Sequence, residues 1–403
     1  MTITINKVDK YTLGLFVLMS LSFLIGFSTI FGKYSLVSLL FSISFIVLLL
    51  LSILYFYDHG YNPLIIAILV LSSINVLFNY SINTTEPLSF SFLKKLLLFL
   101  STILALYLFS ELKEKKVPVA LIVVGPVFLN IIIIIDYFVL SHRHLYYFTD
   151  LETFGFDNPN FAGIWLLHLL LYCFYCFFNY RKTYLRIVFL LIIVLDLYLI
   201  YITGNRSSLL VIFLFIINML LLNNTRWKQK VKLYILIVVL LPILSVFIYY
   251  LLLSIPRVEE WLSFLISDGK ELDSRVGIWE FGLNRFKGIS IFLGDYYGVY
   301  KGVSLSHLHN SHLDVLVSYG VFPFILFCFM LYRILISLSE RVNSFISTIA
   351  FSSFIAILMI GIFEAFLVSG STGLNYFSAG FILLVNNTKT SQSVLNREVL
   401  INE

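Results

Sequence analysis

Long apolar runs with almost no charged residues inside them limit the fold of this chain more than any other feature. Residues 35–57, for example, contain no charged side chain. A helix of roughly 20 apolar residues spans the hydrocarbon core of a bilayer. Since lipid offers the backbone no hydrogen bonds, a spanning segment is a helix or part of a closed barrel. The apolar residues here are continuous rather than alternating, which indicates helices.

Composition and segment count support the same fold class. Only 12% of the chain is charged, against about 25% in soluble domains. The sequence therefore predicts an all-α polytopic membrane protein whose residues 1–403 form a single membrane domain. The first run lacks a small-residue cleavage site, so we interpret it as a retained span and not as a signal peptide. The twelve predicted spans are residues 11–31, 35–57, 63–80, 92–110, 117–140, 161–180, 186–203, 207–223, 233–254, 321–338, 345–367 and 372–386.

Short basic loops predict the orientation in the membrane. Residues 111–116, 181–186 and 225–232 are rich in Lys and Arg, and twelve spans place these loops on the same side as both termini. Basic short loops favour the cytoplasm. The net charge of +5 comes largely from such loops and does not indicate nucleic-acid binding. We expect the tail, residues 387–403, to be cytoplasmic and disordered.

The opposite side carries the longest hydrophilic segment, residues 255–320. Within it, a stripe of Arg275, Ile278, Trp279, Gly282 and Phe286 follows helical spacing. We therefore predict amphipathic helices that lie on the membrane and cap a cavity between the spans, with Trp261 and Trp279 suited to the headgroup region. The cations of this loop indicate either an anionic ligand or a solvated loop of paired charges.

Three of the seven histidines of the chain stand together in SHLHNSHLDVLVSYG, residues 306–320. If the helix includes His309, then His309, Leu313, Leu316 and Gly320 share one face. Asn310 is suited to cap the first turn. Histidine titrates near neutral pH, so His309 is a candidate general base. His307 and His312 are candidates to support it, or to bind zinc, although no clear third ligand is present.

Two arginines are candidate ligands for phosphate. Arg206 lies in TGNRSSLL, a short connection between predicted spans on the non-cytoplasmic side, and Arg275 lies in the long loop. A guanidinium matches phosphate oxygens in a bidentate fork. The alternative is an interfacial anchor that extends toward the headgroups.

Five short motifs in this order resemble the superfamily of O-antigen ligases and Wzy-type O-antigen polymerases. They are DNPN, GNRSS, SRVGIW, FLGDYYG and HNSHLDVLVSYG, and they cover roughly residues 150–335. The family pattern is met by His309, Asn310, Leu313, Leu316 and Gly320, while Arg206 and Arg275 stand at the two arginine positions. FLGDYYG supplies Gly294 and Gly298 and departs from the closely paired glycines usual in the family.

The resemblance implies a GT-C-like glycosyltransferase of the bacterial inner membrane whose active site faces the periplasm or exterior. It implies transfer of a growing glycan from undecaprenyl pyrophosphate to the terminal sugar hydroxyl of a lipid-linked repeat unit, in O-antigen or capsule biosynthesis. His309 is then catalytic, and Arg206 and Arg275 bind pyrophosphate. The partners are the lipid-linked donor and acceptor, membrane lipid and a chain-length regulator. Pyrophosphate is a good leaving group, so we expect no metal and no cofactor.

Two alternatives remain open. A ligase uses the same donor and transfers to lipid A-core. A transporter of lipid-linked oligosaccharides belongs to another class and tends to show two matching halves with broken helices at the midplane. The sequence shows neither transporter feature.

Other polar residues in apolar surroundings receive structural interpretations. Asn158 and Asn160 are expected to hold the DNPN turn, with Asn160 as a possible support residue of the site. We expect interfacial exposure for Asp136 and Glu364, a hydrogen-bonded partner for Asp196, and core packing for His168. Cysteine behaves as a small hydrophobe in apolar runs. The apolar runs of this chain contain Cys173, Cys176 and Cys328.

Overall fold

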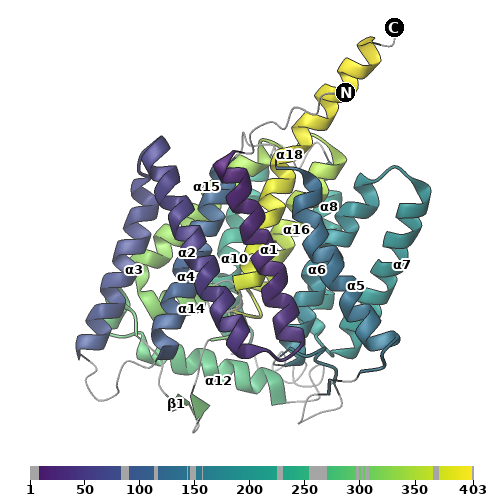
Figure 1. The fold of residues 1–403 in the computed structure, drawn as a ribbon. Helices are drawn as coiled ribbons and strands as arrows, with labels where there is room; N and C mark the ends of the chain where they lie inside the picture. The colour runs from purple at the N-terminus through teal and green to yellow at the C-terminus, as the bar shows by residue number, and fades with distance from the viewer. Residues whose placement is uncertain are drawn as a thin grey trace.

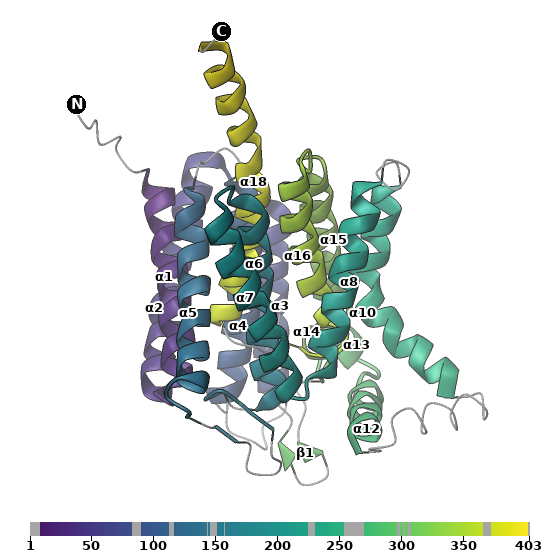
Figure 2. The same ribbon diagram turned by 90° about the vertical axis from the view of Figure 1, so that its right-hand side faces the viewer.

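The helices of this chain stand side by side in one bundle with their axes roughly along a common direction (Figures 1 and 2). The computed structural model describes residues 9–82, 90–112, 117–142, 144–145, 151–156, 158–224, 230–253, 270–295, 299–300, 303–304, 308–365 and 372–401. Helix α12 (Lys270–Arg285) lies across one end of the bundle, and helix α18 (Thr372–Ile401) projects from the other. We call these the α12 end and the α18 end.

Each predicted span coincides with a helix. The remaining bundle helices are α1 (Lys10–Ile30), α2 (Tyr34–His59), α3 (Pro63–Ile82), α4 (Phe90–Glu111), α5 (Val119–Phe138), α6 (Pro159–Asn179), α7 (Thr183–Ile202), α8 (Arg206–Asn223), α10 (Val231–Leu253), α15 (Val321–Ser339) and α16 (Phe345–Ile360). Within the described residues, nine helices are long and apolar enough to cross a bilayer, and Pro63–Phe78 and Phe345–Ile360 are shorter apolar helices. The chain is thus a polytopic helical membrane protein, while the count of twelve spans stays a prediction.

The centre of the bundle is formed by helices that are buried on nearly every side. Trp165, Tyr172 and Tyr175 of α6 are fully buried, as is every residue of α16 from Ser347 to Ile360. Helix α2, in contrast, is apolar all round but exposes most of its side chains. Hydropathy cannot separate a lipid-facing side from a protein-facing side, because lipid is as apolar as a core.

Small residues mark the helix contacts instead. A Cβ on Gly14 of α1 would overlap Leu51 of α2, and a Cβ on Gly163 of α6 would overlap Asn205. Small residues let helix backbones approach closely in a membrane, where no hydrophobic force drives the helices together. These two glycines therefore fix α1 on α2, and the start of α6 on the start of α8.

Two helix ends differ from the sequence predictions. Helix α16 ends at Ile360, seven residues before the predicted end of that span, because the chain turns there and its carbonyls meet another helix. Helix α18 continues to Ile401, beyond the predicted end of that span at residue 386. Residues 387–401 contain no Pro or Gly, and nothing in the sequence stops the helix that begins inside the bundle.

The predicted amphipathic helix is confirmed in α12, but its apolar stripe packs inward. Ile278 and Trp279 are buried against Leu308 and Leu313, and the indole N–H of Trp279 donates to the carbonyl of Leu308 at 2.8 Å. The expected position of Trp279 among headgroups is therefore wrong, whereas Trp261 lies outside the described residues. Three short elements follow α12: helix α13 (Ser290–Leu293), the antiparallel hairpin β1 (Val299–Tyr300) with β2 (Val303–Ser304), and helix α14 (Ser311–Tyr319).

Candidate active site

The start of α14 is held by Asn310, as the sequence predicts. The Asn310 side-chain oxygen accepts hydrogen bonds from the backbone N–H groups of His312 (3.1 Å) and Leu313 (2.9 Å). Its amide donates to the carbonyls of Pro242 in α10 (2.7 Å) and Ile362 after α16 (3.2 Å). One fully buried amide thus caps α14 and joins it to two bundle helices.

His309 itself lies outside the helix, so the predicted shared face is wrong for this residue. Helix α14 begins at Ser311, and the backbone of His309 has φ +50°, in the left-handed region that non-glycine residues rarely adopt. The helix begins only after its N-cap, Asn310, so helical spacing does not extend back to His309. The turn before Asn310 therefore directs the imidazole away from the face of Leu313 and Leu316. Backbone strain of this kind persists only where the surrounding structure imposes it, and it occurs often at functional sites.

The imidazole of His309 meets the carboxylate of Glu364. The His309 Nδ1 and Glu364 Oε2 atoms are 3.0 Å apart, with 29% and 9% of the two side chains exposed. Ser311 fixes the same segment, because its N–H donates to the carbonyl of Gly361 (2.8 Å) and its hydroxyl donates to the carbonyl of Glu364 (2.9 Å). The expected interfacial exposure of Glu364 is therefore wrong.

This pair has the geometry of a base with an orienting acid. A neutral imidazole that donates Nδ1–H to a carboxylate carries its lone pair on Nε2. The carboxylate also stabilises the imidazolium that forms when Nε2 accepts a proton. Spacing in the sequence gave no signal for the pair, since 55 residues separate the two side chains.

A buried ion pair supports the residue before His309. Lys95 Nζ of α4 lies 3.2 Å from both carboxylate oxygens of Asp314, and the side chains are 6% and 0% exposed. Asp314 Oδ1 also accepts a hydrogen bond from the backbone N–H of Leu308 at 3.0 Å. The sequence reasoning missed this pair. The sequence indicates the pair only by a lysine near the start of one apolar run and an aspartate just before another.

His312 is a packed residue of α14. It is 1% exposed, and its ring lies edge-on to Phe327 with ring centroids 5.5 Å apart. Burial lowers the pKa of His312 to about 4, so it is neutral at physiological pH. His307 lies outside the described residues. Among the residues that the structure describes, no group of three His, Cys, Asp or Glu side chains could hold a metal ion.

Arg206 is placed by a cap on α8. Its neighbour Asn205 accepts hydrogen bonds from the N–H of Ser208 (2.9 Å) and the hydroxyl of Ser207 (2.6 Å). The Asn205 amide donates to the carbonyl of Asn160 in α6 at 2.6 Å. The first turn of α8 is thereby fixed against the first turn of α6, and Asn160 contributes through its backbone.

Helix α8, which begins with Arg206, starts at the α12 end. Helix α16, which packs against α8, runs toward that end and stops inside the bundle, shortly before Glu364 (Figures 1 and 2). The Arg206 side chain is exposed. The backbone of Arg275 belongs to α12 at this end, and its side chain is not among those described.

Two acidic residues at the α12 end have basic partners. Arg285 donates to the two carboxylate oxygens of Asp295 at 2.9 and 3.3 Å, which favours the paired-charge interpretation for this loop cation. Asp136 is only 6% exposed, and its two oxygens meet His142 Nδ1 (2.8 Å) and His144 Nε2 (3.1 Å). Interfacial exposure of Asp136 is therefore a wrong prediction, because two histidines after α5 cover its carboxylate.

Three structural interpretations are confirmed. The amide of Asn130 donates to Asp196 at 2.7 Å. His168 is fully buried, with Nδ1 2.8 Å from the carbonyl of Ile164 and Nε2 2.9 Å from the hydroxyl of Ser378. Asn158 caps α6 by accepting from the N–H of Phe161 at 2.8 Å. None of these groups adds to the site around His309.

The chain matches none of the known protein-family models with which it was compared. A comparison with curated proteins finds no match either. The interpretation of the site therefore depends on its own geometry.

Proposed function

We propose that this chain is a glycosyltransferase that elongates a glycan carried on undecaprenyl pyrophosphate, and that its active site lies at the α12 end. In this proposal the α12 end faces the periplasm or exterior of a bacterial inner membrane. The observation that carries the proposal is the 3.0 Å contact between His309 Nδ1 and Glu364 Oε2, two partly exposed side chains. The resemblance of the motifs to O-antigen polymerases and ligases supplies the substrate class.

The chemistry requires one proton transfer and one displacement. A sugar hydroxyl is a weak nucleophile, so Nε2 of His309 takes its proton as the oxygen bonds to the anomeric carbon of the donor. The bond between that carbon and the phosphate oxygen breaks, and its electron pair stays with the pyrophosphate. Glu364 stabilises the imidazolium, and Arg206 and Arg275 stabilise the developing charge on the leaving group.

The test uses purified protein with lipid-linked repeat units in detergent. Longer glycans on the carrier are the expected product, and His309→Ala should abolish them while expression and membrane insertion remain normal. Full-length polymer from that variant contradicts the base assignment. Arg206→Lys should also be severely impaired, because an ammonium cannot reproduce the guanidinium fork. A fully active lysine variant would reduce Arg206 to an interfacial anchor.

The same assay separates the alternatives. Product on lipid A-core, with no elongation on the carrier, identifies a ligase. Translocation of the lipid-linked unit across vesicles without any new glycosidic bond identifies a transporter.

A further inference from the structure

Two cavities of about 300 and 320 Å³ adjoin each other at the α18 end, far from the candidate active site. The first lies between α3, α4 and α15, and the second lies between α10 and α15. Arg333 and Ser337 of α15 line both. Neither cavity is lined by His309, Glu364 or Arg206.

Arg333 stands at the end of an apolar stripe. Phe322, Ile325, Phe329 and Arg333 follow one another at helical spacing, and the first three side chains are about half exposed (53%, 54% and 50%). This face of α15 therefore contacts the hydrocarbon of the bilayer. Arg333 is six residues, about 9 Å of helix, from the end of α15. The Arg333 guanidinium lies 6.0 Å from the centroid of the Phe329 ring, so this cation directly continues the stripe. A charge at this depth is costly in hydrocarbon and favours an anionic partner.

The polar residues around Arg333 are suited to a phosphate. Arg341 donates to Ser337 Oγ at 2.8 Å and to Asn386 Oδ1, which fixes its guanidinium in the wall of the first cavity. Lys232 of α10 lines the second cavity. The carboxylates lining the two cavities belong to Glu111 and Glu340, so three cationic side chains face two acidic ones.

We propose that these two cavities bind the headgroup of an anionic phospholipid, with its phosphate on Arg333 and Lys232 and its acyl chains along the apolar stripe of α15. A guanidinium fork matches two phosphate oxygens. The stripe that leads to Arg333 gives an apolar tail a surface that a soluble phosphate compound would leave uncovered. This site is separate from the proposed glycan transfer, so either proposal can fail without the other.

The experiment compares lipid binding by variants in detergent, with native mass spectrometry and thermal stability as readouts. Phosphatidylglycerol and phosphatidylcholine are titrated separately. We expect wild-type protein to bind phosphatidylglycerol preferentially, and Arg333→Gln to weaken that binding about 10- to 100-fold, the value of a charged hydrogen bond. Lys232→Gln is the second variant and should weaken it in the same direction.

The control is Arg181→Gln, an exposed arginine in the connection between α6 and α7 at the same end. It removes only general surface attraction, which is worth less than about fivefold. Equal losses for the Arg333 and Arg181 variants, or equal binding of the two lipids by wild type, overturn the proposal. Inorganic phosphate at about 10 mM is titrated as a third ligand. If it stabilises the protein as strongly as phosphatidylglycerol does, the occupant is a soluble phosphate and the lipid assignment is wrong.

Discussion

The carboxylate of Glu364 determines which nitrogen of His309 is basic, because it meets Nδ1 at 3.0 Å. Glu364→Gln keeps the side-chain shape and removes the charge. The imidazolium formed during proton transfer then loses a charged hydrogen bond, so we expect kcat for glycan elongation to fall about 10- to 100-fold with little change in KM.

The matched control is Glu280→Gln, which changes an exposed glutamate of α12 and should leave kcat unchanged. Both variants are first shown to be monodisperse in detergent. An unaltered kcat in the Glu364 variant would mean that the contact serves folding and not the reaction.

At the same scale, the sequence indicates His309 and Asn310 as candidate residues, but it does not predict the environment of His309. The cap by Asn310 followed from residue type and position. The conformation of His309 did not, because counting helical positions through a cap assumes that the helix has already begun. The sequence also did not indicate Glu364 as the partner of His309. Glu364 lies in a different predicted span, and a carboxylate near the end of a span suggests exposure at the membrane interface.

Helix α14 is connected to α4 by the buried pair of Lys95 and Asp314. Lys95→Met leaves the Asp314 carboxylate buried without this cation, and breaking a buried pair in this way costs about 3–5 kcal/mol. We expect a clear loss of thermal stability in detergent.

The double variant Lys95→Met with Asp314→Asn should regain much of that stability. It removes both charges, and an asparagine oxygen can still accept the hydrogen bond that Leu308 N–H gives to Asp314. A double variant no more stable than the single one would show that the pair is not the source of the loss. Thermal unfolding of wild type, both single variants and the double variant forms the required cycle.

A second property of α14 is its response to pH through His312. Burial lowers the pKa of this imidazole to about 4, whereas an unfolded histidine titrates near 6.5. Between these values the unfolded chain binds a proton that the folded chain does not. The contribution of His312 to the free energy of unfolding is therefore fully present above pH 6.5 and is lost as the pH decreases toward 4.

The full difference corresponds to about 3 kcal/mol for this one group. His312→Phe fits the aromatic contacts with Phe327 and carries no titratable nitrogen. Between pH 7 and pH 4, the melting temperature should therefore fall less steeply for the variant than for wild type. An equal fall in both proteins would contradict the assignment of this pH dependence to His312.

At the scale of the molecule, the existence of the helices followed from the apolar runs, whereas their arrangement did not. Helix α6, whose side chains are mostly buried, is no more apolar than helix α2, which exposes most of its side chains. The residues that decide the packing are small or polar ones such as Gly163 and Asn205, whose contacts join the starts of α6 and α8. The sequence pattern therefore predicts the fold class and the candidate role of His309. It does not predict the pairs of His309 with Glu364 and of Lys95 with Asp314, because each pair joins residues that are far apart in the chain.

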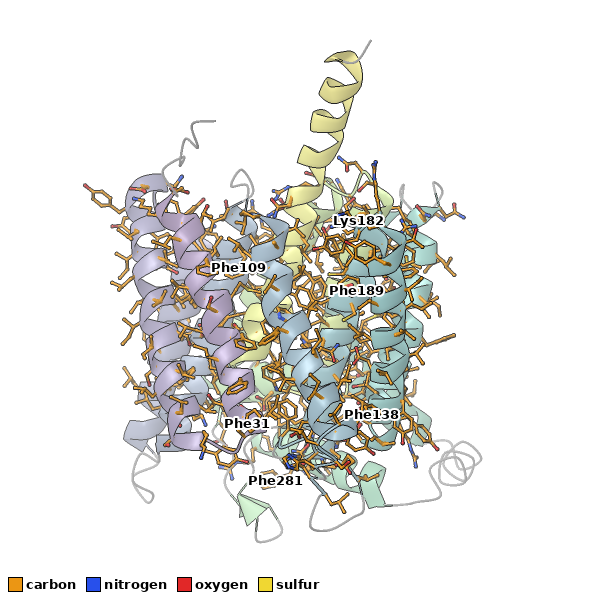
Figure 3. The ribbon with its side chains drawn as sticks, turned by 45° about the vertical axis from the view of Figure 1, so that its right-hand side comes forward. Phe31, Phe109, Phe138, Lys182, Phe189 and Phe281 are labelled. Atoms are coloured by element: carbon orange, nitrogen blue, oxygen red, sulfur yellow. The ribbon has the colours of Figure 1, made fainter. Side chains whose placement is uncertain are left out.

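Orientation in the membrane is the last property that the arrangement makes testable. Lys182 and Phe281 lie at opposite ends of the bundle (Figure 3), and the short basic connection that contains Lys182 is at the α18 end. Such connections favour the cytoplasm, so we predict that the α12 end faces outward. Cys173, Cys176 and Cys328 are buried, which gives a low background for thiol labelling.

We therefore expect Lys287→Cys, at an exposed position after α12, to react with a membrane-impermeant maleimide in intact cells. Lys182→Cys should react only after lysis. The reverse pattern would place His309 and Glu364 in the cytoplasm, where the proposed transfer on the outer face cannot occur, and labelling of both positions in intact cells would show that the maleimide had crossed the membrane. Because the assay needs no substrate, it tests the location of the site independently of its chemistry.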